Sequence, residues 1–267
     1  MTFDPFNDFE SRGYLRNTAA LRDPVAVKEF EHRAFLAKLE QALRNLARIG
    51  RLAYRDVLDT HKTLFEAVYP WAGQDRLLTA PDLAVSKGPV LFAHPRDARA
   101  AVEYGLRLGL DKSIMRDRPG EVMGYLAYGH PFLDGNGRTI LVVHAELAQR
   151  AGLAIDWAAT DKTAWLTALT SELDSPGKGH LDTFLKSYVR PAIGHENLVS
   201  HIVRTRGLDG NPDRPPGANK VLGRFSEPAL QARYQQQQQR RRGQASVPRR
   251  ASQPPPNDDP RGRGGRG

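Results

Sequence analysis

A nine-residue segment, His-Pro-Phe-Leu-Asp-Gly-Asn-Gly-Arg at positions 130–138, brings together residue types that can act on a phosphorylated substrate. The imidazole of His130 has an unperturbed pKa of about 6.5, so it could accept a proton from an attacking hydroxyl group. The carboxylate of Asp134 could hold a divalent metal ion that bridges phosphates, and the guanidinium of Arg138 could neutralise phosphate charge. A base, a metal ligand and an anion-binding cation thus favour phosphate chemistry.

Two stretches with helical character flank this segment. Residues 121–128 precede it, and residues 139–151 follow it as an apolar-rich segment. The first turn of a helix presents unpaired backbone N–H groups, and glycines let a ligand approach the backbone closely. The segment is therefore predicted to cradle an anion at the start of the second helix. Singly, its residues have ordinary alternatives, because a histidine before a proline is commonly a surface or cap residue and Gly-Asn-Gly is a common turn.

The segment resembles the signature of the Fic domain family, H-x-F-x-[D/E]-G-N-G-R-x-x-R. Upstream, residues 61–73 end in Tyr-Pro-Trp-Ala-Gly and are similar to a helix and turn of that family, at the expected distance. The resemblance covers residues 8–190. It implies a mainly helical fold with a β-hairpin flap, and transfer of AMP from Mg-ATP to a Ser, Thr or Tyr hydroxyl group of a target protein.

The resemblance also implies a role for each matching residue. His130 would be the general base and Asp134 the Mg²⁺ ligand, while Phe132 would anchor the loop in the core. The phosphates of ATP would be held by Gly135, Asn136, Gly137 and Arg138. Lys87, in the flap, is either a solvated loop cation or a contact to the nucleotide or target, and the residues favour neither.

The second arginine of the signature is absent, because Leu141 takes its place. In the family that arginine would hold the terminal phosphate. Another cation could replace it, the nucleotide could bind differently, or activity could be reduced. The alternatives are therefore a Fic-fold enzyme that transfers UMP, GMP, phosphate or phosphocholine, and a catalytically silent binding module.

Hydrophobic periodicity predicts an all-α, mainly helical bundle with a small β-hairpin flap. Helices are expected from Pro24, over residues 54–69, from Pro95 to Leu108 and from Pro119. His61 falls on the inward face of the second helix, so we interpret it as a buried, hydrogen-bonded residue rather than a ligand. Strands are expected at residues 77–79 and 90–92, and the target protein would lie along this flap, at about residues 77–92.

Composition divides the chain into an arm (1–23), a catalytic domain (24–200) and a tail (201–267). The formal net charge is +9, and the tail carries fourteen Lys and Arg against five Asp and Glu, so the body is neutral. Nucleic-acid binding is therefore not expected of the body, and any such affinity would belong to the tail. The tail contains five consecutive glutamines and few apolar residues, so disorder is predicted there.

Location and regulation follow from absences in the sequence. The chain of 267 residues has no cysteine and no apolar run near the ~20 residues of a membrane helix, so we expect a soluble protein. The expected setting is the cytoplasm of a bacterium or, for an effector or toxin, a host cell reached by secretion. In many relatives a Ser/Thr-x-x-x-Glu helix blocks the nucleotide site. Thr170–Asp174 is the nearest match and ends in aspartate, which leaves room for an inhibitory antitoxin protein acting in trans.

Overall fold

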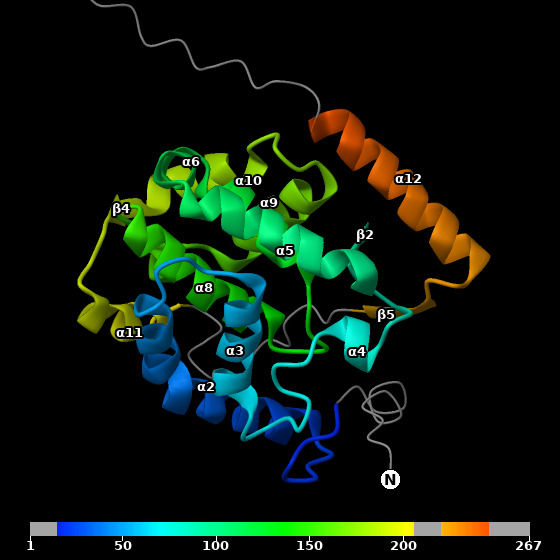
Figure 1. The fold of residues 1–267 in the computed structure, drawn as a ribbon, viewed down its shortest axis with the longest axis horizontal. Coiled ribbons are helices and arrows are strands. Elements are labelled where there is room, and N and C mark those ends of the chain that lie inside the picture. Colours follow the sequence, from blue (N-terminus) through cyan, green and yellow to red (C-terminus); the bar gives the residue numbers. More distant parts are fainter. Residues whose placement is uncertain (1–14, 206–219, 246–267) are drawn as a thin grey trace, which may run out of the picture.

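The computed structural model describes residues 15–205 and 220–245, which form a bundle of helices with short antiparallel strand pairs (Figure 1). The predicted all-helical bundle with a hairpin is confirmed. The α-helices are α2 (Pro24–Ala47), α3 (Tyr54–Phe65), α4 (Arg76–Thr79), α5 (Pro95–Leu110), α6 (Lys112–Asp117), α7 (Pro119–Gly129), α8 (Asn136–Arg150), α9 (Lys162–Asp174), α10 (His180–Leu185), α11 (His195–Val203) and α12 (Pro228–Ala245). The remaining elements are η1 (Trp157–Ala159), η2 (Lys186–Tyr188), β1 (Leu83–Lys87), β2 (Val90–Leu91), β3 (Leu153–Ile155), β4 (Val189–Pro191) and β5 (Lys220–Arg224).

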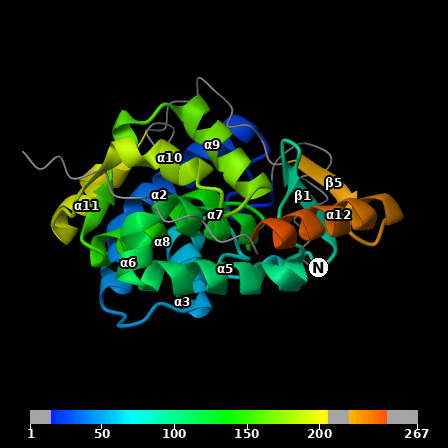
Figure 2. The same cartoon turned by 90° about the horizontal axis from the view of Figure 1, so that it is seen from above.

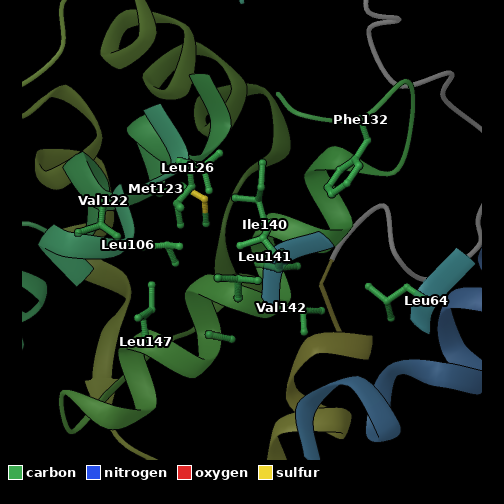
Figure 3. Close-up of a cluster of buried hydrophobic side chains, with 14 of the residues drawn as sticks. Leu64, Leu106, Val122, Met123, Leu126, Phe132, Ile140, Leu141, Val142 and Leu147 are labelled. Atoms are coloured by element: carbon green, nitrogen blue, oxygen red, sulfur yellow. The ribbon is translucent and has the colours of Figure 1, made fainter. Parts of the chain in front are cut away.

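Helix α8 lies at the centre of the bundle, as its apolar sequence predicts. Figure 3 shows Ile140, Leu141 and Val142 on this helix among the side chains of neighbouring helices. Helix α5 packs closely on α7, because a Cβ at Gly105 would lie 3.1 Å from the side chain of Leu126. Helices α7 and α8 are thereby held in place, and the loop between them is held at both ends.

Helix starts follow local signals in the sequence. Pro24, Pro95 and Pro119 each occupy the first turn of a helix, where a missing N–H costs nothing. The carboxylate of Asp23 accepts hydrogen bonds from the backbone N–H groups of Val25 and Ala26, which caps α2. The expected boundaries at these prolines are confirmed.

The hairpin differs from expectation in its first strand. Residues 77–79 belong to the short helix α4, so the predicted strand there is wrong. Asp75 caps this helix by accepting a hydrogen bond from the N–H of Leu78, and Leu78 is 72% exposed, so its apolar side chain does not mark a sheet face. Strand β1 begins at Leu83 and pairs with β2 across the turn at Gly88, with Lys87 opposite Val90. The predicted second strand, at residues 90–92, is confirmed at β2.

Residues 220–245 also differ from expectation, since they were assigned to a disordered tail. Strand β5 pairs with β1, giving a three-stranded sheet in the order β2-β1-β5, and α12 follows it. Figures 1 and 2 place β5 and α12 at one end of the bundle, beside the hairpin. Phe225, Leu230 and Tyr234 are buried there, so a few apolar residues among glutamines and arginines are enough to order the segment. The parts of the predicted tail at 206–219 and 246–267 lie outside the described residues.

Helix α2 begins at Pro24, and α11 runs from His195 to Val203, across the expected domain limit at residue 200. Residues 1–14 of the predicted arm lie outside the described residues. The following segment packs on the bundle, since Leu15 is buried and the N–H of Thr18 donates to the carbonyl oxygen of Val68. Over the described ranges, the helices are all too short or too polar to cross a bilayer.

Candidate active site

The predicted base, His130, ends helix α7 in the left-handed backbone conformation, with φ of 42° and ψ of 57°. A residue other than glycine rarely adopts this conformation, which costs about 1 kcal/mol or more. The surrounding structure holds it there. The guanidinium Nε of Arg76 donates a hydrogen bond of 2.8 Å to the carbonyl oxygen of His130, and the N–H of Arg76 donates to the carbonyl oxygen of Pro131 at 2.6 Å.

Asn136 fixes the loop and the tautomer of His130. Its side-chain Oδ1 accepts the N–H of Phe132 at 2.9 Å, and its Nδ2 donates to the carbonyl oxygen of Phe132 at 2.7 Å. Since a backbone N–H can bond only to the amide oxygen, the orientation of the amide is determined. The remaining Nδ2 hydrogen points to Nε2 of His130, 3.2 Å away. Nε2 is therefore the acceptor, and its lone pair is the one available for a proton.

The ring of His130 is buried, with 4% of the residue exposed. It stacks on Phe92, which directly follows β2, with ring centroids 3.8 Å apart and planes 8° from parallel. Burial holds the pKa of His130 well below its usual range, and the positive charges of Arg76 and Lys87 lower this pKa further. The imidazole is thus neutral at pH 7, which is the form a general base requires.

Phe132 lies in the core, fully buried, and stacks on the imidazole of His61 with a centroid distance of 3.7 Å. His61 is buried and hydrogen-bonded, as interpreted from the sequence. Its Nδ1 accepts the N–H of Gly73 at 2.9 Å, so its Nε2 carries the proton and donates to the carbonyl oxygen of Asp134 at 3.0 Å. Burial lowers the pKa of His61 to about 3, which keeps the ring uncharged. Residues 61–73, the motif upstream of the loop, therefore hold the loop in place through His61.

The start of α8 offers the backbone N–H groups expected of an anion cradle. Gly135 is the N-cap, with φ of 75°, and supplies no side-chain cap, so the N–H groups of the first turn, at residues 136–138, have no partner within the helix. A Cβ at Gly137 would meet nothing within 4 Å, whereas one at Gly135 would lie 2.7 Å from the ring of Phe65. Open space therefore adjoins the Cα of Gly137.

Arg138 forms an ion pair with a buried carboxylate. Its Nη2 lies 3.1 Å from Oε2 of Glu31 on α2 and 4.0 Å from Oδ1 of Asp134, and its guanidinium stacks over the ring of Phe65 at 4.7 Å. Glu31, 2% exposed, also accepts a hydrogen bond from the hydroxyl group of Tyr69. Burial raises the pKa of Glu31, Asp134 raises it further, and Arg138 opposes both. The expected phosphate-binding arginine is thus placed beside the loop but already has a counterion.

Asp134 is the acidic residue of the loop, and its side chain is accessible to solvent. Its side chain is 41% exposed, and its Oδ1 accepts the N–H of Gly135 at 2.6 Å. Among residues 15–205 and 220–245, no three His, Cys, Asp or Glu side chains gather as a metal-binding group. A single carboxylate is nevertheless sufficient for Mg²⁺ when substrate phosphates and water complete the octahedron. The oxygen chemistry and exposure of Asp134 fit that ion.

Lys87 and Leu141 differ in the charge that they could offer to a nucleotide. Lys87 ends β1, and the positive charge of its ammonium group lowers the pKa of His130. Burial, followed by the charge of Lys162, lowers the pKa of Lys87 itself. Leu141 is 9% exposed in the core (Figure 3) and offers no contact to a nucleotide.

Three residues that contact His130 or Arg138 are not predicted from the sequence. Glu31 stood in the apolar stripe of the first helix, and a carboxylate at a core position was a usable signal. Arg76 and Phe92 gave none, because their contacts to the loop join segments 54 and 38 positions apart in the chain.

Comparison with known proteins places this loop in a family. The Fic/DOC family model matches residues 51–148. Protein adenylyltransferase VbhT of Bartonella schoenbuchensis is 32% identical over 164 residues, which are 58% of this chain and 32% of VbhT. Probable protein adenylyltransferase y4lH of Sinorhizobium fredii is 29% identical over 164 residues, 58% of this chain and 81% of y4lH. The chain thus spans about a third of VbhT but most of y4lH.

Solved structures show the same fold. The VirB-translocated effector BepC of Bartonella tribocorum, crystallised with bound AMPPNP, has a TM-score of 0.57 at 18% identity, covering 72% of this chain and 100% of that chain. The N-terminal Fic domain of a VirB-translocated effector from Bartonella quintana, with bound ADP, has a TM-score of 0.59 at 21% identity, covering 72% and 99%. At these identities the likeness establishes the fold alone.

Proposed function

We propose that this chain, which matches the Fic/DOC family over residues 51–148, is an enzyme that transfers AMP from Mg-ATP to a hydroxyl group of another protein. The observation that carries the proposal is the loop itself. A neutral imidazole with its Nε2 lone pair directed along the loop lies a few residues from the open helix start at Gly137. Support comes from the relatives named protein adenylyltransferase and from solved relatives that hold adenine nucleotides.

The reaction would run in one displacement. The target hydroxyl group replaces the amide of Asn136 at Nε2 of His130, which takes the proton. The hydroxyl oxygen forms a bond to the α-phosphorus of ATP as the bond from that phosphorus to the bridging oxygen breaks. Pyrophosphate leaves with the electron pair. The N–H groups of the first turn of α8, residues 136–138, stabilise the charge that develops on the phosphate oxygens.

Asp134 is the residue that would hold Mg²⁺. When bound, this ion would supply positive charge that neutralises the phosphate oxygens. The carboxylate of Asp134 also accepts a hydrogen bond from the N–H of Gly135, which fixes the carboxylate beside the start of α8. Lys87, on the flap, would add positive charge toward the nucleotide or the target, since its charge already lowers the pKa of His130.

A different transfer is the second candidate, and Leu141 favours it. With an apolar residue at this position and Arg138 paired with Glu31, the cation expected at the terminal phosphate is not supplied by α8. Phosphocholine transfer would place a different group there, and phosphate transfer would make the terminal phosphate the group transferred. UMP or GMP transfer would keep the triphosphate and change the base. A catalytically silent binding module is the third candidate, and it would be supported if the protein bound no nucleotide.

The partner would be a protein whose extended segment lies along the flap, with an antitoxin in trans as a regulator. We place the reaction inside a cell, either the bacterium or a host reached by secretion, because solved relatives are VirB-translocated effectors. The chain's own segment 220–245 contacts this flap, which bears on how a target reaches it.

The test is label transfer from four donors. Purified protein is incubated with a cell lysate and labelled ATP, UTP, GTP or CDP-choline, and protein-bound label is measured. Label from ATP with the wild type, and none with His130→Ala, is the expected result. Label from another donor would select the second candidate, and equal labelling by both proteins would refute the role of His130. Calorimetry with ATP on the wild type and on Asp134→Ala tests the silent binding module. ATP binding that is lost in Asp134→Ala would indicate an enzyme whose target is missing from the lysate. No ATP binding by the wild type would indicate the silent module.

A further inference from the structure

Both outer edges of the hairpin are occupied by the chain's own C-terminal segment, residues 220–241, which we call the clasp. On one side, β5 pairs antiparallel with β1 from Ser86 opposite Lys220 to Leu83 opposite Arg224. The pairing continues beyond the strand, since the N–H of Phe225 donates to the carbonyl oxygen of Asp82 at 2.7 Å. The outer edge of β1 is therefore already taken by main-chain pairing.

On the other side, side chains of α12 bind the exposed edge of β2. Gln237 accepts the N–H of Leu91 at 3.0 Å and donates to its carbonyl oxygen at 2.7 Å, and Arg233 donates to the carbonyl oxygen of Pro89 at 2.7 Å. The amide of Gln237 thus makes the two bonds that a residue of another strand would make. It is 4% exposed, so these bonds are shielded from water.

The clasp has a small apolar core of its own. Phe225, Leu230 and Tyr234 pack on Ala84 and Leu91, in a cluster separate from the main core of the bundle. Its polar contacts reach the start of α5, where the hydroxyl group of Tyr234 accepts the N–H of His94 at 3.0 Å and donates to Asp97 at 2.9 Å. Because the two cores are separate, the clasp can leave the hairpin without opening the bundle.

We infer that the clasp competes with the target protein for the hairpin, so that the flap accepts a target segment only when residues 220–241 have moved away. This inference rests on the proposed function, in which an extended target segment pairs with the flap. A tethered segment acts at an effective concentration on the order of millimolar, so the clasp holds the flap closed against weak or dilute targets. The partner that displaces it is an extended segment with a large apolar residue in the place of Phe225.

A reversible lock tests the inference in the full chain. Because the sequence has no cysteine, Val85→Cys combined with Val221→Cys can form only one disulfide within the chain, between β1 and β5, at residues that lie opposite each other. We expect oxidation to lower label transfer from ATP to lysate proteins more than about tenfold, and a reducing agent to restore it. Val85→Cys alone, treated identically, is the control. Oxidised and reduced forms that label equally fast would overturn the inference.

Opening the clasp should have the opposite effect. Gln237→Ala removes two buried hydrogen bonds and should raise label transfer about tenfold. Its matched control is Gln236→Ala, the same change at an exposed position of the same helix. Equal labelling by the two variants, with α12 still formed by circular dichroism, would contradict the competition.

A readout without catalysis distinguishes failure of the inference from failure of the proposed function. A fluorescent peptide with the sequence Lys-Val-Leu-Gly-Arg-Phe-Ser, copied from residues 220–226, is titrated while anisotropy is measured. Binding should be strongest to Gln237→Ala, weaker to the wild type and absent from the oxidised lock. This order would uphold the clasp even without any label transfer, so the clasp is tested separately from the transferase. Equal peptide binding to all three proteins would reject the clasp whatever the labelling.

Discussion

The guanidinium Nε of Arg76 lies 2.8 Å from the carbonyl oxygen of His130, and its Nη2 lies 2.8 Å from that of Ala93. One fully buried side chain thus joins the catalytic loop to the exit of the flap, and Nη1 reaches Leu83 at the entry to β1. Arg76 is a positioning residue, because it fixes the backbone of His130 without touching the reacting atoms.

Arg76→Lys should lower label transfer about 100-fold, because lysine keeps the charge but cannot make three directed bonds. Arg76→Met should in addition shift the acid limb of the pH profile to higher pH. The charge of Arg76 lowers the pKa of His130, so its removal raises that pKa and protonates the base at a higher pH. Rates are compared with those of the exposed control Arg55→Met, after thermal melting confirms folding. An unchanged acid limb in Arg76→Met would show that the charge is immaterial.

The two glycines of the cradle should respond in opposite ways to alanine. Gly137→Ala should keep or raise stability, by up to about 1 kcal/mol, since it replaces glycine in a helix beside open space. It should nevertheless weaken ATP binding roughly tenfold, because the methyl group occupies the approach to the backbone. Gly135→Ala should destabilise the fold, because φ is 75° and the Cβ would lie 3.0 Å from Nε2 of His61. Calorimetry and urea unfolding of both variants check this, and unweakened ATP binding in Gly137→Ala would place the phosphates elsewhere.

The buried pair of Glu31 and Arg138 should prove strongly coupled. Removing either partner leaves a buried charge, so Glu31→Ala or Arg138→Ala should each cost about 3–5 kcal/mol of unfolding free energy. The double variant should cost less than the sum, by roughly 1–3 kcal/mol. Urea unfolding measures the cycle. The same cycle on Glu40 and Arg44, whose side chains are 65% and 62% exposed, should give a coupling below about 0.5 kcal/mol. Additive losses at Glu31 and Arg138 would mean that the pair is not an energetic unit.

Stability should fall as the pH drops below about 6.5. Burial lowers the pKa of His144 to about 4, whereas the unfolded chain binds that proton near pH 6.5. The unfolded state therefore holds more protons between these values, and the unfolding free energy decreases as the pH falls through the window. His144→Gln should reduce this slope by about 1.4 kcal/mol per pH unit between pH 6 and 4.5, and the exposed control His180→Gln should not. Urea midpoints at several pH values give the slope, and equal slopes for all three proteins would contradict the assignment.

Local patterns account for the parts of the fold that the sequence predicted. Proline caps, helical periodicity and the Gly-Asn-Gly turn each act within a few residues, so α2, α5, α7 and the catalytic loop could be placed. The first strand was misplaced because Leu77 and Leu78 are apolar yet exposed, which composition does not reveal. The roles proposed for His130, Asp134 and Lys87 stay predictions until label transfer and nucleotide binding are measured.

Long-range pairing accounts for what the sequence could not supply. Nothing near Arg76 indicates that it bonds to a carbonyl 54 residues away. The clasp was missed for a similar reason: Gln237 sits in a run of glutamines, and its burial depends on the edge of β2, 146 residues earlier. A polar, repetitive segment can be ordered when a partner elsewhere in the chain satisfies its amides.

Leu141 also bears on how this loop can change over time. It sits on a helix packed on all sides, so a guanidinium placed there would lose hydration among apolar neighbours. A substitution of Leu141 by arginine would therefore cost stability before it could add any affinity for a terminal phosphate. The side chains that surround position 141 would have to change together with it.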